Sequence, residues 1–135
     1  MVRGIRNNNP LNIRISPANW QGKITPSRDL EFEAFSSMIL GIRAAMVNMR
    51  THILQDSRRC ITTTISREIS RWAPATENNT GQYVRLVCDR AGLNPDDTLD
   101  ILRKSMVCKL CQAMAWMETG VAMDLADFES AYELL

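Results

Sequence analysis

The sequence lacks the features that mark several common classes of protein. Its 16 Lys and Arg residues are nearly balanced by 15 Asp and Glu residues, so the net charge at pH 7 is only +1. A basic excess is what draws proteins to nucleic-acid phosphates, so we expect no nucleic-acid partner. No apolar run approaches the roughly 18 residues of a membrane-spanning helix, so we also expect no membrane insertion.

Cysteine and histidine are scarce, with four cysteines and one histidine in the chain. Cys108 and Cys111 form a C-x-x-C, but this pair lies inside a predicted helix with no strand before it, unlike a redox motif. A zinc site would need two more ligands at regular spacing, whereas Cys60, Cys88 and His52 are scattered. We therefore expect structural or free thiols, no metal and no cofactor.

The chain has the size and composition of one globular domain. Its 135 residues are 45% hydrophobic and 23% charged, without internal repeats, which is enough for one hydrophobic core. Apolar and polar residues alternate within 13–35, between turns at 17–19 and 26–29, which predicts a small β-hairpin region. Elsewhere apolar residues recur at three and four positions, which predicts helices at 37–54, 62–72, 79–91, 99–118 and 125–134. The prediction is a mainly α (α+β) domain over 1–135, with five to six helices and a small N-terminal hairpin.

Asparagines crowd the N-terminal segment, where residues 3–12 read RGIRNNNPLN. Asparagine tolerates left-handed backbone and bonds its own main chain, so we predict a rigid turn here rather than a helix or strand. Carboxamides gathered in one turn either form a polar wall for a ligand or serve only to make the turn. Asn8, Asn9 and Asn12 are the candidates for ligand contacts, and Trp20 either stacks on a sugar or covers the core.

A second candidate feature is the helix end KLCQAMAWMETG, which spans Lys109–Gly120. It places Glu118 in the last turn of a largely apolar helix, just before a Thr-Gly break. A carboxyl group partly shielded from water is suited to general acid catalysis. The alternative is an ordinary helix C-terminus, where a polar residue is followed by Gly at the C′ position.

A third candidate segment is the polar loop at 73–80 and the start of the helix that follows. Glu77 is either a second catalytic carboxylate or an acid that interacts favourably with the helix dipole. Asn79 is a candidate ligand contact. Tyr83 either donates a hydrogen bond to a ligand or to Glu118, or lies at the edge of the core.

Several strings together resemble a family of phage and prophage peptidoglycan-hydrolase-like proteins. They are RGIRNNNPLNIR, WQG, F-x-x-F-S-x-x-x-x-G-I-R-A, I-x-R-W-A-P-x-x-E-N-N-T-x-x-Y-V and AMAWMETG, and they span Arg3 to Gly120. The wider resemblance is to the lysozyme-like superfamily, which includes goose-type lysozymes, lytic transglycosylases and glucosaminidases.

The resemblance also implies a rearranged chain order. In the superfamily an apolar helix ends in Glu and Ser/Thr-Gly, and an Asn-rich turn, a small β region and further helices follow. Here 113–120 matches the helix and 7–12 matches the turn, at opposite ends of the chain. We therefore expect a circular permutation, with the segment after Gly120 running near the N-terminus. Two positions depart from the family pattern: Leu11 replaces a common Gly, and Met117 replaces a polar residue.

The activity implied by the resemblance is cleavage of the β-1,4 bond between N-acetylmuramic acid and N-acetylglucosamine of peptidoglycan. Glu118 would protonate the leaving oxygen. A lytic transglycosylase uses that one carboxylate, whereas a lysozyme adds a second, for which Asp29, Glu31, Glu33 and Glu77 are candidates. The alternative is a non-catalytic virion component or glycan-binding protein that keeps the fold.

The resemblance also suggests partners and a site of action. The expected partner is the peptidoglycan glycan strand, with an immunity protein or phage virion components as further possibilities. The N-terminus has no apolar stretch of signal-peptide type, so we expect synthesis in the cytoplasm. Action in the periplasm or cell wall then requires release by a phage holin, delivery by a virion, or a secretion machine carrying an antibacterial effector.

Overall fold

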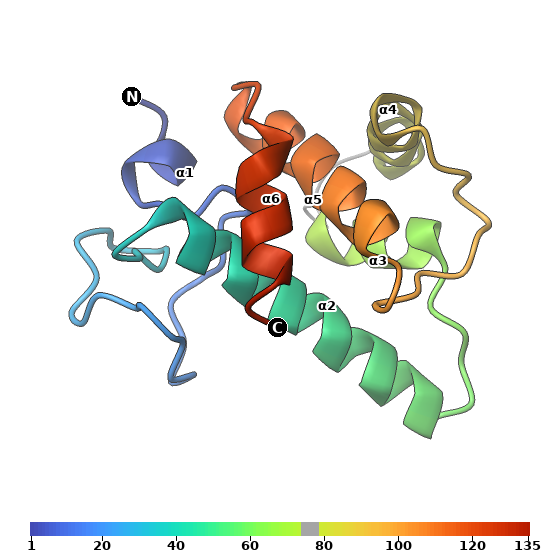
Figure 1. Cartoon of the computed structure of the whole chain (residues 1–135), viewed down its shortest axis with the longest axis horizontal. Coiled ribbons are helices and arrows are strands. Elements are labelled where there is room, and N and C mark those ends of the chain that lie inside the picture. The colour runs from blue at the N-terminus through green and yellow to red at the C-terminus, as the bar shows by residue number, and fades with distance from the viewer. Residues whose placement is uncertain (74–78) are drawn as a thin grey trace.

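The computed structural model describes residues 1–73 and 79–135. Within these ranges the chain forms six helices and no sheet, which confirms the prediction of a mainly helical protein (Figure 1). They are α1 (Arg3–Arg6), α2 (Met38–Arg58), α3 (Ile65–Trp72), α4 (Thr80–Ala91), α5 (Lys104–Thr119) and α6 (Leu125–Tyr132). None of these helices is long and apolar enough to cross a membrane.

The helix boundaries follow from local capping. The Ser37 side chain accepts a hydrogen bond from the Leu40 N–H, and α2 begins at the next residue. Thr64 caps α3 in the same way, so this helix starts at residue 65 and not at residue 62. Gly92 and Gly120 adopt left-handed backbone at the ends of α4 and α5. The predicted helix at 99–118 starts only at 104, because the preceding residues form a turn in which the Arg103 N–H bonds the Asp100 carbonyl.

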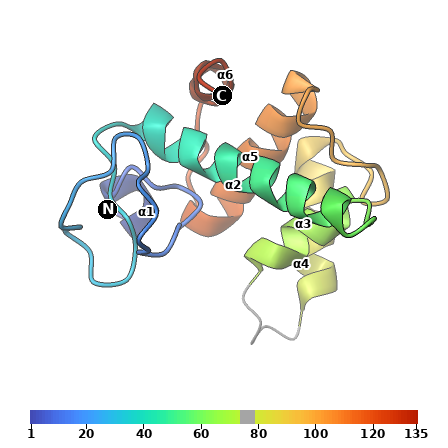
Figure 2. The same ribbon diagram turned by 90° about the horizontal axis from the view of Figure 1, so that it is seen from below.

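Helix α5 is the most buried helix, and α4, α6, α1 and α2 all contact it. Val107, Leu110, Cys111 and Met114 have no exposed surface. The two views agree that residues 1–35 lie toward one end of α2, with α3 and α4 toward the other end (Figures 1 and 2).

The predicted β-hairpin region at 13–35 was wrong. In this segment only isolated antiparallel bridges form, between Arg14 and Phe32 and between Lys23 and Phe35. The Asn9 side chain takes up two main-chain groups that a ladder would pair with each other, because its Oδ1 accepts from the Ile13 N–H and its amide donates to the Glu33 carbonyl. Side-chain capping of this kind competes with regular sheet formation.

The prediction of a turn throughout residues 3–12 was also wrong in part. Residues 3–6 form a single helical turn, α1, and the asparagines follow it. α1 packs on the end of α5, where a Cβ added to Gly4 would lie 3.0 Å from the Thr119 methyl carbon. The asparagine turn and the METG helix end are therefore neighbours in space although they lie at opposite ends of the chain.

Candidate functional site

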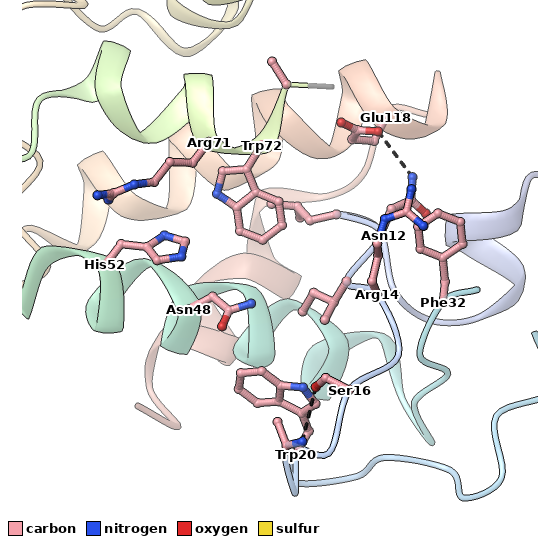
Figure 3. Close-up of a pocket in the computed structure, with 14 residues that line it drawn as sticks. Asn12, Arg14, Ser16, Trp20, Phe32, Asn48, His52, Arg71, Trp72 and Glu118 are labelled. Atoms are coloured by element: carbon pink, nitrogen blue, oxygen red, sulfur yellow. Dashed lines mark hydrogen bonds between the residues drawn. The ribbon is translucent and has the colours of Figure 1, made fainter. Parts of the chain in front are cut away.

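A groove with a volume of about 780 Å³ runs between the N-terminal segment and the helices (Figure 3). Residues 11–20 and Phe32 form one wall, and side chains from α2 and the end of α3 form the other. Glu118, in the last turn of α5, also lines it. The volume is typical of small-molecule and cofactor sites.

Both carboxyl oxygens of Glu118 are hydrogen-bonded. The Tyr83 hydroxyl donates to Oε1 at 2.9 Å, and the Asn12 side-chain amide donates to Oε2 at 3.3 Å. These three residues come from α5, α4 and the asparagine turn. The structure thus brings together three of the residues that the sequence singled out, and two of them, Asn12 and Glu118, line the groove.

The asparagine turn packs closely against α2. Asn8 and Asn12 have positive φ angles of 52° and 54°, a backbone region that asparagine tolerates better than most residues. Gly41 allows α2 to approach the turn, because a Cβ on Gly41 would overlap the Asn8 carbonyl oxygen. This close approach fixes the turn that carries Asn12 to Glu118.

Two of the three asparagines predicted to bind ligand lie outside the groove. Asn9 is completely buried, so its side chain is inaccessible to a ligand, and it bonds the main chain at residues 13 and 33. Asn8 donates to the Phe35 carbonyl at 3.0 Å and does not line the groove. Both amides build the turn, and Asn12 alone of the three reaches the groove.

The carboxylates of the N-terminal segment also lie outside the groove. Glu33 is fully buried and pairs with the Lys23 ammonium at 3.1 Å. The pKa of Asp29 is lowered to about 2, chiefly by the main-chain N–H of Glu31 and then by the Asn7 amide. Among the described residues that line the groove, Glu118 is the only carboxylate.

The remaining predicted site residues fall in different places. Trp20 lines the groove and also packs against the core, and its stacking on a sugar stays a prediction. Asn79 is exposed just before α4 and does not line the groove. Glu77 lies outside the described residues. Tyr83 is in the core cluster and also bonds Glu118.

Sequence reasoning missed the opposite wall of the groove. Asn48 and His52 come from α2, and Arg71 and Trp72 come from the end of α3. The signal for the first pair was available, because polar residues four apart share one helix face. Trp72 falls within the helix predicted at 62–72, but nothing in the helical pattern marks it as a groove residue. Within residues 1–73 and 79–135, no three His, Cys, Asp or Glu side chains gather as a metal site.

Comparison with known proteins gives one informative similarity. No family model matches the chain. The chain is 36% identical over 102 residues to Protein P5 of Pseudoalteromonas phage PM2. The aligned region covers 73% of this chain and 61% of Protein P5, so the chain spans less than two thirds of that relative.

Proposed function

We propose that the protein cleaves cell-wall glycan, at the β-1,4 bond between N-acetylmuramic acid and N-acetylglucosamine of peptidoglycan. The observation that carries this proposal is the Glu118 carboxyl group, which lines the groove with both oxygens hydrogen-bonded, to Tyr83 and Asn12. Cleavage of a glycosidic bond requires an acid that protonates the leaving oxygen. A carboxyl group already oriented at a ligand-sized groove is suited to that step.

The environment of Glu118 favours a mechanism with one carboxylate. No other described groove residue is acidic, so no described side chain is placed to activate water as a second carboxylate. In the one-carboxylate route, Glu118 first gives its proton to the leaving oxygen. It then takes a proton from the 6-hydroxyl of the sugar, whose oxygen closes on C1 to give a 1,6-anhydro end. Glu77, outside the described residues, stays the candidate for a hydrolytic second carboxylate.

The proposal includes a lysozyme-like fold in permuted order. The contact between Gly4 of α1 and Thr119 at the end of α5 supports it, since it joins the asparagine turn to the helix end as the resemblance requires. The similarity to Protein P5 supports a phage setting. We therefore propose peptidoglycan strands as substrate, with delivery to the cell wall by phage components or a secretion machine, and an immunity protein in the latter case.

Clearing of purified cell walls tests this function. We expect the native protein to reduce the turbidity of a peptidoglycan suspension and Glu118→Gln to lose that activity by at least about 100-fold, since the amide cannot donate the proton. Glu129→Gln is the matched control, because Glu129 is exposed on α6 and does not line the groove.

Two outcomes would contradict the proposal. If the native protein and Glu118→Gln clear walls equally, Glu118 is not the acid. If neither clears walls but both sediment with them, the protein is a non-catalytic glycan-binding component.

A further inference from the structure

The groove wall formed by α2 and α3 has the composition of a ligand-binding surface. Asn48 and His52 are four residues apart on α2 and both line the groove. Trp72 adds an indole ring from the end of α3. An aromatic surface with a few convergent polar groups is typical of ligand sites. In Figure 3, Glu118 and His52 lie on opposite sides of Trp72.

A buried carboxylate behind this wall fixes its side chains. Glu68 has no exposed surface and does not line the groove itself. Its Oε2 lies 2.7 Å from His52 Nδ1 and accepts from the Trp72 indole N–H at 3.1 Å. Its Oε1 accepts from the Arg71 guanidinium at 3.1 Å. One buried carboxylate therefore orients three groove side chains from two helices, through hydrogen bonds of the strong, charge-assisted kind.

We propose that His52 and Trp72 bind a second sugar residue of the glycan, away from Glu118, and that Glu68 is the positioning residue that orients them. The choice of a glycan as the ligand rests on the proposed function. His52 contacts Glu68 through Nδ1, so its Nε2 atom is left for the ligand. Trp72 contacts Glu68 through the indole N–H, so the face of its ring is left for the ligand.

The chemistry of an acetamido sugar matches this pair. Its hydroxyl and acetamido groups supply hydrogen-bond donors and acceptors for the imidazole and for the Asn48 carboxamide. The apolar C–H face of a pyranose ring packs on a flat aromatic surface, as the amphipathic indole allows. The positive charge of Arg71 is offset by its ion pairs with the carboxylates of Asp56 and Glu68. The wall therefore suits a neutral, hydroxyl-rich ligand.

Nuclear magnetic resonance tests the contact directly, because His52 is the only histidine in the chain and its imidazole signals need no assignment. The probe is an N-acetylglucosamine hexamer added to the Glu118→Gln protein, which leaves the ligand intact. We expect a saturable shift of the His52 Hε1 and Nε2 resonances. If the hexamer shifts main-chain amides around Asn12 but leaves the His52 signals unchanged, the inference is overturned.

Kinetics on cell-wall glycan give a second readout. For His52→Ala we expect KM to rise about tenfold with kcat within about twofold of native, the pattern of a lost binding contact. Arg50→Ala is the matched control, since Arg50 is exposed on α2 and does not line the groove. An unchanged KM in His52→Ala would overturn the inference.

A double-mutant cycle separates positioning by Glu68 from a merely structural role. In the Glu118→Gln protein, Glu68→Gln should weaken hexamer binding, but it should add little when His52→Ala and Trp72→Phe are already present. If Glu68→Gln weakens binding equally in both backgrounds, Glu68 is structural and the positioning role is refuted.

The failures of the two proposals are distinguishable. If the native protein cleaves walls but His52→Ala binds and cleaves as native does, this inference fails and the proposed function stands. If the hexamer shifts His52 without any cleavage of walls, the inference stands and the catalytic role fails. If walls are not cleaved and the hexamer does not bind, both fail.

Discussion

Gly41 of α2 lies directly against the main-chain carbonyl oxygen of Asn8, so closely that a Cβ at residue 41 would overlap that oxygen. The contact joins the helix to the turn that carries Asn12, whose amide bonds Glu118. The geometry of the groove therefore requires a residue without a side chain at position 41.

Replacement of Gly41 by Ala should destabilise the protein. The added methyl meets main chain rather than a flexible side chain, so the turn or the helix must shift. Overpacking of this kind costs about 1–3 kcal/mol. Gly81→Ala is the control, because nothing lies within 4 Å of a Cβ at that helical position. It should be neutral or stabilising by up to about 1 kcal/mol. Urea unfolding measures the free energy of unfolding of both variants, and equal values would contradict the close contact between Gly41 and Asn8.

Tyr83 and Tyr132 offer a matched pair of hydroxyl deletions. The Tyr83 hydroxyl donates to Glu118 at 2.9 Å, whereas the Tyr132 hydroxyl donates to the Ile101 carbonyl at 2.7 Å. We expect Tyr83→Phe to lower kcat on cell-wall glycan by roughly 10- to 100-fold, because the carboxylate that Glu118 becomes on giving up its proton loses a hydrogen bond, and a bond to a charged group is worth this much. Tyr132→Phe should keep native activity. Equal activities in the two variants would show that the bond to Glu118 is irrelevant to the reaction.

Stability should fall on acidification in a way that depends on Asp29. Its pKa in the folded protein is about 2, below the ordinary value of 3.8, so the unfolded chain binds the proton more tightly. The stabilisation from ionised Asp29 is therefore complete above about pH 4 and is lost as the pH falls toward 2. Asp29→Asn removes this contribution, so the native protein should exceed the variant in stability at pH 6 and approach it near pH 2. A difference in stability between the native protein and Asp29→Asn that stays constant from pH 6 to pH 2 would contradict the lowered pKa of Asp29.

The N-terminal segment shows where sequence patterns stop being informative. Alternation at 13–35 predicted strands, but Asn9 bonds the Ile13 N–H and the Glu33 carbonyl, which strands would pair with each other, and periodicity does not reveal such side-chain bonds. The five longer helices were predictable, because an apolar period is a local pattern, although α3 and α5 begin later than predicted. Glu118 was found from a helix end and a resemblance. The groove wall that contains His52 and Trp72 was not found from the sequence, since it depends on how α2 and α3 pack against each other.

Thiol reactivity checks the packing of α5 independently of function. Cys60 is exposed, whereas Cys88, Cys108 and Cys111 are buried. Burial raises the pKa of the Cys108 thiol to about 11, so little thiolate is present at pH 8. A disulfide reagent at pH 8 should therefore modify one thiol rapidly, and Cys60→Ser should abolish that fast phase. Rapid modification of two or more thiols would mean that the core around α5 opens readily.

The most direct test of the central claim is mass spectrometry of glycan fragments released from purified peptidoglycan. The native protein should create new N-acetylmuramic acid ends in the 1,6-anhydro form, because Glu118 is the only carboxylate among the described groove residues. Glu118→Gln should create none. If the native protein creates no new glycan ends, or if Glu118→Gln creates as many as native, the role of Glu118 as the catalytic acid is refuted.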